Sequence, residues 1–513
     1  MPKQLARRIA ILALVAAPIA ARAQAFNVVE TTIAEIHGAM RAGRLTCREL
    51  VTSYLDRIAA IDKRGPAINA LIVVNPKALA VADSLDRRMA TTGLAGPLHC
   101  IPMIVKDNFE TFDLPTTVGS LSLAGLQPAQ DAFMVRKVRE AGAIVLAKSN
   151  MAEFAFTPYE TVSSILPGYT KNPYALDHVT AGSSGGTAAA VAASLGESGL
   201  GTDTGNSIRG PSAHQALVGI RSTMGLTSRD GIAPLFLSAD IAGPMARTVA
   251  DAVTVFQVVA GEDPADTSTA RSRGHRAQDY TSYLKRDALA GARIGVLRQA
   301  YERPTTDSEV VTVFARALDD MRRAGAVIVD PVAVPGLETM FRGVGNCNEF
   351  KFQINDWLAR QGNRAPVHSL EEVIRSRRYH PSIQVRLESL QADTIPPSRN
   401  PACAAREEAR MKFRAAVTAL MDSLKLDAMV YPTWSNPPRL IGDLNTPHGD
   451  NSQVFSPNTG FPAITVPMGY TRGVLPAGLQ LFGRAWSEPT LIALAYSYEQ
   501  TTKHRKPPVL SGR

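Results

Sequence analysis

Two glycine-rich clusters that carry serine lie within one short stretch, residues 181–212. The first cluster holds Ser183 and Ser184 between glycines, and the second runs from Gly201 to Ser207. Glycines permit backbone turns that a side chain would forbid, and they leave N–H groups exposed. Such N–H groups can stabilise the negative charge that develops at an acyl carbon under attack. The stretch therefore predicts a serine nucleophile, an oxyanion pocket and a further group between them.

A lysine at the end of an apolar segment is a second candidate for chemistry. Residues 101–105 are apolar and predict a buried strand, and Lys106 follows directly. A lysine at this position is usually a solvated strand terminus. A desolvated lysine would instead have a lowered pKa and could act as a base. The spacing alone leaves both interpretations open.

Two other serine motifs compete with this interpretation. Residues 182–186 also fit G-x-S-x-G, with Ser184 as the nucleophile of a strand–turn–helix elbow. That elbow needs an apolar strand before it, and residues 174–180 do not predict one. Ser282 and Lys285 fit S-x-x-K, but they lie in a polar stretch, and a motif with so few fixed positions is expected by chance in a chain of this length. Neither glycine cluster has the spacing of a phosphate-binding or dinucleotide-binding loop.

The elements that must position these residues alternate between helix and strand. Residues 187–195 are small and predict a helix that packs closely on its neighbours. Thr32 and Thr46 each begin a capping box, which predicts a helix after each of them. Further helices are predicted at 76–91, 133–141, 308–324 and 406–424, with more helix in 336–398. Further strands are predicted at 70–74, 143–147, 292–297 and 327–332. Residues 261–286 are polar and predict a loop. This alternation indicates an α/β fold.

Composition limits the classes of partner. The chain has 513 residues, of which 45% are hydrophobic and 20% charged, as in a globular enzyme with a large core. The formal net charge is +9, but the basic residues are scattered and not interleaved with aromatic residues. A nucleic-acid partner is therefore not indicated. The oligomeric state stays open, a homodimer included.

The first 25 residues predict a secretory signal. Lys3, Arg7 and Arg8 form a positive segment, residues 9–20 are apolar, and small residues end at Ala23 or Ala25. An uncleaved anchor is the alternative, but the apolar segment is short and contains Pro18. The Arg7–Arg8 pair is only a weak sign of twin-arginine export. We expect an exported protein, periplasmic or secreted, with no membrane association after the signal is removed.

The cysteines and histidines indicate no metal site. Cys47, Cys100, Cys347 and Cys403 are far apart and show no ligand spacing, and the nine histidines form no metal motif. Disulfides are compatible with an oxidising compartment. We expect the cysteines to be small core residues instead.

Three ordered motifs resemble the amidase signature family. They are residues 96–108, which end in Lys106, residues 181–190, and residues 201–213. The resemblance runs from the N-terminal helices to residues 245–248 and resumes at 458–467 and 476–484. It implies a single large α/β domain, with a mixed central sheet flanked by helices. It also implies a signature core at about 95–250, a variable pocket region at about 261–425 and a C-terminal return at about 426–500, all within an amidase domain at 26–513.

The resemblance assigns roles to the three candidate side chains. It implies Ser207 as the nucleophile, Ser183 as a bridging serine after a cis peptide bond, and Lys106 as the base. The backbone N–H groups of residues 204–207 (Thr204, Gly205, Asn206 and Ser207) would form the oxyanion hole. Ser184, Asp203 and Arg209 would support the loop. No cofactor and no catalytic metal are implied.

Two residues depart from the family's pattern. Asn206 stands where glycine is usual before the nucleophile, and asparagine tolerates left-handed backbone angles better than most residues. Cys100 also stands where glycine is usual, and the sequence gives no functional reason for it.

The expected activity is hydrolysis of the C–N bond of a carboxylic amide, small or peptidic, through an acyl-enzyme on Ser207. The family also includes a glutaminase subunit used in tRNA charging, but predicted export argues against that role. An esterase, carbamate hydrolase or β-lactam-type acyl hydrolase with the same triad is the alternative. A non-catalytic binding protein on this scaffold is a further class, disfavoured because all three triad residues are present.

Overall fold

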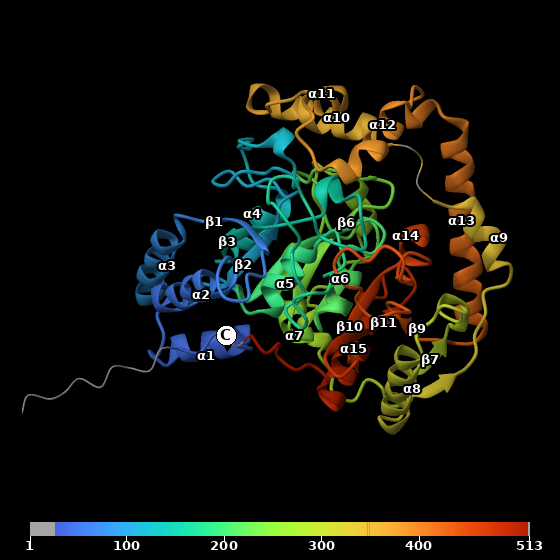
Figure 1. Cartoon of the computed structure of the whole chain (residues 1–513). Coiled ribbons are helices and arrows are strands. Elements are labelled where there is room, and N and C mark those ends of the chain that lie inside the picture. Colours follow the sequence, from blue (N-terminus) through green and yellow to red (C-terminus); the bar gives the residue numbers. More distant parts are fainter. Residues whose placement is uncertain (1–25, 346, 348, 511–513) are drawn as a thin grey trace, which may run out of the picture.

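A mixed β-sheet forms the centre of the molecule (Figure 1). The computed structural model describes residues 26–345, 347 and 349–510. In this part of the chain the sheet has 11 strands in the order β1-β3-β2-β4-β6-β5-β10-β11-β9-β7-β8. The strands are β1 (Leu71–Val74), β2 (Pro102–Lys106), β3 (Ile144–Ser149), β4 (Ser198–Asp203), β5 (Val218–Arg221), β6 (Ile241–Ala246), β7 (Arg293–Val296), β8 (Val327–Val329), β9 (Ala428–Pro432), β10 (Ala463–Thr471) and β11 (Leu475–Phe482).

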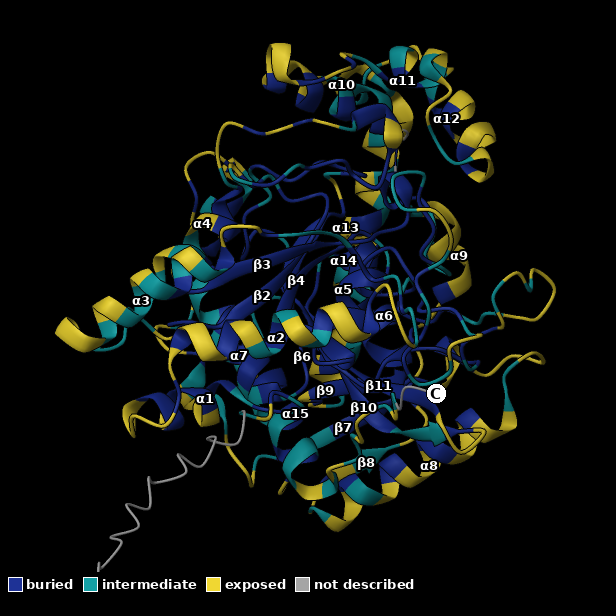
Figure 2. Ribbon diagram, turned by 60° about the vertical axis from the view of Figure 1, so that its left-hand side comes forward, coloured by how far each residue is buried: buried dark blue, intermediate teal, exposed yellow. Residues whose placement is uncertain are grey.

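Helices flank this sheet, so the chain is a single large α/β domain, as the sequence predicts. The helices are α1 (Ile33–Arg41), α2 (Cys47–Ile61), α3 (Ala78–Thr92), α4 (Phe133–Glu140), α5 (Gly185–Ala192), α6 (Arg209–His214), α7 (Val249–Val259), α8 (Ser308–Arg323), α9 (Leu337–Gly343), α10 (Phe350–Gln361), α11 (Leu370–Ser376), α12 (Gln384–Gln391), α13 (Pro401–Ser423), α14 (Ser456–Thr459) and α15 (Glu488–Thr502). Strands β2, β3 and β4 are buried along their whole length, while the outward sides of α2, α3 and α8 are exposed (Figure 2).

The middle of the sheet, from β4 to β9 in the strand order, is antiparallel, and a group of parallel strands lies on each side of it. Strand β2 runs parallel to both β3 and β4, and β4 pairs antiparallel with β6. Strands β10 and β11 form a long antiparallel pair that joins β5 to β9. Because β2 and β4 are parallel neighbours, Lys106 at the end of β2 and the loop that follows β4 meet at the same edge.

The predicted capping boxes at Thr32 and Thr46 are confirmed. Each threonine side chain accepts a hydrogen bond from the backbone of the glutamate three residues on, and that glutamate side chain bonds back. The predicted strands and helices around residues 70–147 are present, with ends that move by one or two residues. Strand β4 was not predicted, because its sequence, Ser-Gly-Leu-Gly-Thr-Asp, has little bulk. Gly199 is needed because α5 packs closely on this strand: a Cβ there would lie 2.5 Å from Thr187 Cγ2.

Helices α10, α11 and α12 form a separate layer on one end of the domain (Figure 1). Their apolar side chains, including Phe350 and Trp357, pack against Phe154, Phe156 and Phe236 of the body. Trp357 Nε1 and Gln361 Nε2 also donate to Glu110 Oε1. We call residues 350–391 the helical cap. The mostly helical segment predicted from the sequence is therefore an accessory layer on the central sheet.

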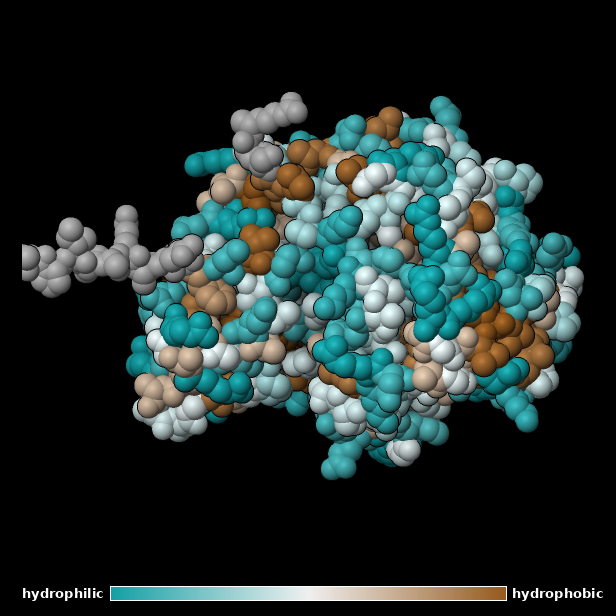
Figure 3. All heavy atoms as spheres, turned by 90° about the horizontal axis from the view of Figure 1, so that it is seen from below, coloured by the Kyte–Doolittle hydropathy of each residue, from teal (hydrophilic) through white to brown (hydrophobic). Residues whose placement is uncertain are grey.

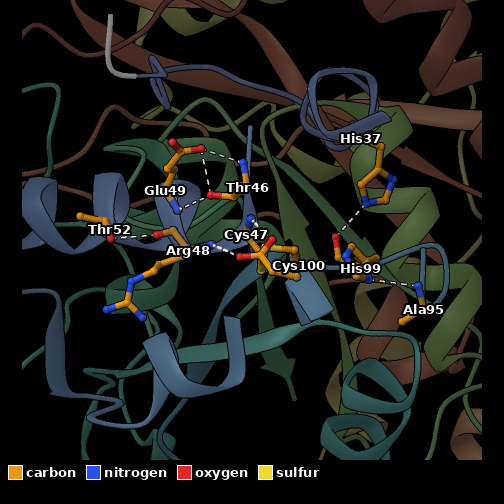
Figure 4. The surroundings of a disulfide bond; sticks show 10 residues. His37, Thr46, Cys47, Arg48, Glu49, Thr52, Ala95, His99 and Cys100 are labelled. Carbon is orange, nitrogen blue, oxygen red and sulfur yellow. Dashed lines mark hydrogen bonds between the residues drawn. A yellow bond between two sulfur atoms is a disulfide. The ribbon is translucent and has the colours of Figure 1, made fainter. Parts of the chain in front are cut away.

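Both pairs of cysteines are disulfide-bonded, which corrects the prediction of unpaired core residues. Cys47 is bonded to Cys100 and Cys347 to Cys403. Figure 4 shows that the first disulfide joins the start of α2 to the segment before β2. Cys100 has a φ of 60°, a left-handed angle that glycine adopts most easily. The disulfide explains why cysteine stands at position 100, for which the sequence gave no functional reason. The pairing could not be predicted from local sequence, because the bonded cysteines are 53 and 56 residues apart.

Hydrophilic side chains cover most of the face shown in Figure 3, with apolar side chains in small groups among them. In the residues that the structure describes, no helix combines the length and apolarity needed to cross a bilayer. The predicted signal at residues 1–25 lies outside the described residues. The C-terminal segment lies beside α1, where Arg505 forms an ion pair with Glu30 (Figure 1).

Candidate active site

Lys106 is completely buried at the end of β2, next to the centre of β4. Its Nζ lies 2.7 Å from Ser183 Oγ and 2.7 Å from Thr202 Oγ1. Burial lowers the pKa of Lys106 to about 7, although Asp203 and Asp240 act in the opposite direction. Of the two alternatives from the sequence, the structure therefore supports a desolvated lysine and not a solvated strand terminus. At neutral pH a substantial part of an amine with this pKa is neutral and able to accept a proton.

Ser183 lies in a turn directly before α5. The peptide bond between Gly182 and Ser183 is cis. The N–H of Gly182 donates to the carbonyl oxygen of Pro158 at 2.8 Å, so residues 157–160 cover this turn. A Cβ at Gly182 would lie 2.5 Å from the carbonyl oxygen of Glu160, so this approach requires glycine. The turn holds the Ser183 hydroxyl against Lys106.

Ser184 points into the protein and contacts a backbone group. Its Oγ donates to the carbonyl oxygen of Thr202 in β4 at 3.1 Å. The residues before it, 174–180, form no strand, so the strand–turn–helix elbow is absent here. Ser184 therefore joins α5 to the sheet and is not placed as a nucleophile.

Ser207 lies in the loop between β4 and α6 and is 5% exposed. The N–H groups of residues 204–207 have no hydrogen-bond acceptor among the described residues. The next two N–H groups, of Ile208 and Arg209, both donate to Asp203 Oδ2. The loop thus presents consecutive free donors beside a serine hydroxyl, which is the arrangement needed to hold an oxyanion.

Asp203 is the anchor of this loop. It is fully buried between Arg209, whose Nε lies 3.0 Å from Oδ2, and Arg221, whose Nη1 lies 2.8 Å from Oδ1. Burial alone would raise the pKa of Asp203, but the two arginines outweigh it and hold the pKa below its usual value. Asp203 therefore stays ionised and fixes the start of α6.

The structure brings together the residues that the sequence predicted, from three separate parts of the chain. Lys106, Ser183 and the loop at 203–209 meet at one edge of the sheet. Ser282 and Lys285 are both exposed, and Ser282 Oγ bonds only to a nearby backbone oxygen, so the S-x-x-K motif forms no site.

Four polar residues of the site were not identified from the sequence as side-chain contributors. Thr202 Oγ1 contacts Lys106 and also accepts from Asn108 Nδ2 at 3.1 Å. Asp240 accepts from the hydroxyl of Thr204 and from the N–H groups of Leu235 and Phe236. Arg221 is the fourth. Thr202 and Asn108 are close to recognised motifs, but Asp240 and Arg221 come from β6 and β5 regions without a local signal.

A small cavity adjoins the site on the side of the 204–207 loop. It is lined mainly by Asn108, Thr202, Thr204, Asp240 and apolar residues at 232–237. Within the described residues, no three His, Cys, Asp or Glu side chains are grouped so that they could hold a metal ion.

The sequence matches the model of the amidase family over residues 49–492, and the chain belongs to this family. It is therefore an enzyme, a hydrolase that acts on amides.

The relatives of this chain match it over most of its length. A peptide amidase from Stenotrophomonas maltophilia has a similar structure, with 39% identity and a TM-score of 0.85 over 94% of this chain and 99% of that one. A probable amidase of Arabidopsis thaliana is 33% identical over 94% of this chain and 92% of its own length. A glutamyl-tRNA(Gln) amidotransferase subunit of Acinetobacter baumannii is also 33% identical, over 92% of this chain and 96% of its own length.

Proposed function

We propose that this enzyme cleaves amides through an acyl-enzyme on Ser207, with Lys106 as the base and Ser183 as the relay between them. The observation that supports this most is the 2.7 Å contact between Lys106 Nζ and Ser183 Oγ inside a fully buried site. A serine hydroxyl is a poor nucleophile until a base takes its proton. A neutral lysine that is hydrogen-bonded to a second serine can act as this base indirectly, because the second serine passes the proton on.

In the first half of the reaction, Ser207 Oγ attacks the carbonyl carbon of the amide. Its proton passes to Ser183 Oγ while the Ser183 proton passes to Lys106 Nζ. The oxyanion is held by the N–H groups of residues 204–207, which have no acceptor among the described residues. Thr202 Oγ1 accepts an N–H of Lys106, which leaves the lone pair of the neutral amine free to take the proton of Ser183.

The C–N bond then breaks, and a proton returns from Lys106 through Ser183 to the leaving nitrogen. Ammonia or an amine departs and leaves an acyl ester on Ser207. Water attacks this ester by the same relay, with Lys106 taking its proton. The free acid departs, and the Ser207 hydroxyl is restored.

Covalent labelling tests this assignment. A fluorophosphonate probe followed by peptide mass spectrometry should place the label on Ser207 of the wild-type enzyme. Ser207→Ala should remove both labelling and hydrolysis, and Lys106→Ala should abolish turnover while the protein remains folded. Ser282→Ala, at an exposed serine, is the control and should change neither. A label on Ser184 or Ser282, or near-normal turnover by Lys106→Ala, would refute the assignment.

The substrate class is proposed from the likeness to the peptide amidase of S. maltophilia. We propose that an amide, small or at the end of a peptide, is the natural class. A panel of primary amides, anilides, peptide amides, carbamates, β-lactams and esters at equal concentration tests this. Higher kcat/KM on esters or carbamates than on every amide would favour the alternative acyl hydrolase.

We propose further that the protein is exported. The support is the predicted signal at residues 1–25 together with the two disulfides, which are typical of oxidising compartments. Expression of the full chain with fractionation, followed by N-terminal sequencing, tests this proposal. Cleavage after Ala23 or Ala25 and recovery outside the cytoplasm are expected. An intact N-terminus in the cytoplasmic fraction would contradict it.

A further inference from the structure

The side chain of Asn206 lies against the proposed nucleophile. Its Oδ1 is 3.4 Å from Ser207 Oγ, and its Nδ2 is 3.4 Å from the carbonyl oxygen of Pro158. Asn206 is only 1% exposed and does not have a left-handed φ. The backbone here therefore does not need glycine, and the position can carry a side chain that acts on the site.

The orientation of the Asn206 amide follows from its partners. The carbonyl oxygen of Pro158 can only accept a hydrogen bond, so the NH2 end of the amide must face it. The oxygen end then faces Ser207, whose hydroxyl must be the donor. The amide lies on the Cα of Gly210, since a Cβ there would come within 2.6 Å of Asn206 Nδ2.

The hydroxyl of Ser207 therefore donates to Asn206 and not to the relay serine Ser183. Among the described residues, Asn206 Oδ1 is the one hydrogen-bond partner of Ser207 Oγ, whereas Ser183 Oγ is bonded to Lys106. Attack requires the Ser207 proton to pass to Ser183, so the contact with Asn206 must break first. At 3.4 Å the hydrogen bond is long and weak, and a bound substrate can displace it.

We propose that Asn206 is a positioning residue that holds the Ser207 hydroxyl in a resting orientation until substrate enters. This inference rests on the proposed role of Ser207. Substrate binding replaces the Asn206 contact, and the hydroxyl then turns toward Ser183. The cost of this displacement falls on binding, so it raises KM and lowers kcat/KM for the resting enzyme.

The test compares Asn206→Ala with Asn206→Asp. Alanine does not require a left-handed φ and removes the acceptor, so labelling of Ser207 by a fluorophosphonate should become about two- to threefold faster, the low end of the effect of losing one hydrogen bond. KM for an amide should fall by a similar factor with kcat unchanged. Aspartate keeps an acceptor and strengthens it with charge, so labelling should become slower than in the wild type.

Faster labelling of Asn206→Ala and slower labelling of Asn206→Asp would distinguish a positioning role from a role in packing over Gly210 alone. If both variants label more slowly, or if Asn206→Ala labels at the wild-type rate while its melting temperature is unchanged, the inference is wrong. Ser207→Ala, Ser183→Ala and Lys106→Ala are measured alongside. If labelling survives Ser207→Ala, the proposed function fails, whatever the Asn206 variants do. If labelling depends on all three residues, the proposed function holds and the Asn206 variants alone decide whether the inference is right.

Discussion

At the scale of single residues, the site depends on the state of one buried amine. Lys106 has lost its water, and its charged form is disfavoured by burial more than Asp203 and Asp240 favour it. The lowered pKa is a consequence of the fold around the end of β2, where no solvent reaches Nζ. The chemistry proposed here needs the neutral amine, so pH should report on this residue directly.

We expect kcat/KM to fall as pH decreases through about 7, because Lys106 becomes protonated there. Lowering the pH adds the proton that the base must lack, so the loss lies on the acid side. Measuring kcat/KM against pH with one amide substrate gives the midpoint. Asp240→Asn removes a charge that raises the pKa of Lys106 and should move this midpoint to lower pH.

Asp319→Asn is the matched control, since Asp319 lies on α8 with an exposed side chain. It removes the same charge and should leave the midpoint unchanged. A flat profile through pH about 7, or equal shifts in both variants, would argue against Lys106 as the titrating base.

At the scale of elements, the site depends on how closely α5 packs on β4. This helix begins just after Ser183, and the strand ends just before the Ser207 loop, so their separation sets the distance between the two serines. The contact is close because Gly199 has no side chain: a Cβ there would lie 2.5 Å from Thr187 Cγ2 and 2.9 Å from the carbonyl oxygen of Ile104.

Gly199→Ala should therefore push α5 from the sheet and lower the free energy of unfolding by about 1–3 kcal/mol, the usual cost of overpacking. Activity should fall further than stability predicts, since Ser183 moves with the helix. Urea unfolding and kcat/KM measure the two effects. Gly38→Ala is the control: Gly38 is in α1 with no atom within 4 Å of its Cβ position, so this variant should gain about 0.5–1 kcal/mol. Equal stability of the two variants would contradict this view of α5.

At the scale of the whole molecule, two disulfides join segments that are distant in sequence. Cys47–Cys100 connects the N-terminal helices to the segment that leads into β2 and Lys106 (Figure 4). Cys347–Cys403 joins the segments on either side of the helical cap. Each disulfide closes a long loop, and therefore each restricts the unfolded chain strongly.

In a Cys347→Ser/Cys403→Ser background, adding Cys47→Ser/Cys100→Ser should lower the free energy of unfolding by about 4 kcal/mol, from the 53-residue separation. Denaturant unfolding with and without reductant measures this. Reductant should destabilise the background protein by the same amount and leave the fourfold variant unchanged. A background protein that is insensitive to reductant after complete unfolding and refolding would show that this disulfide contributes no stability.

Local signals in the sequence predicted much of the fold. The capping boxes at Thr32 and Thr46 and the apolar run before Lys106 depend on neighbours a few residues away, so they could be recognised without a structure. Strand β4 could not, because glycine and serine have low strand propensity and only its position between β2 and β6 makes it a strand.

The sequence by itself determined the ordered motifs, the α/β class and the three candidate side chains at Lys106, Ser183 and Ser207. Only the tertiary structure decided which residues meet them. Thr202 and Asp240 face the site because strands that are distant in the chain are neighbours in the sheet. Burial lowers the pKa of Lys106, and Asn206 contacts the Ser207 hydroxyl. Desolvation and contacts across the sheet depend on the packing of the whole chain, so a local sequence pattern cannot predict them.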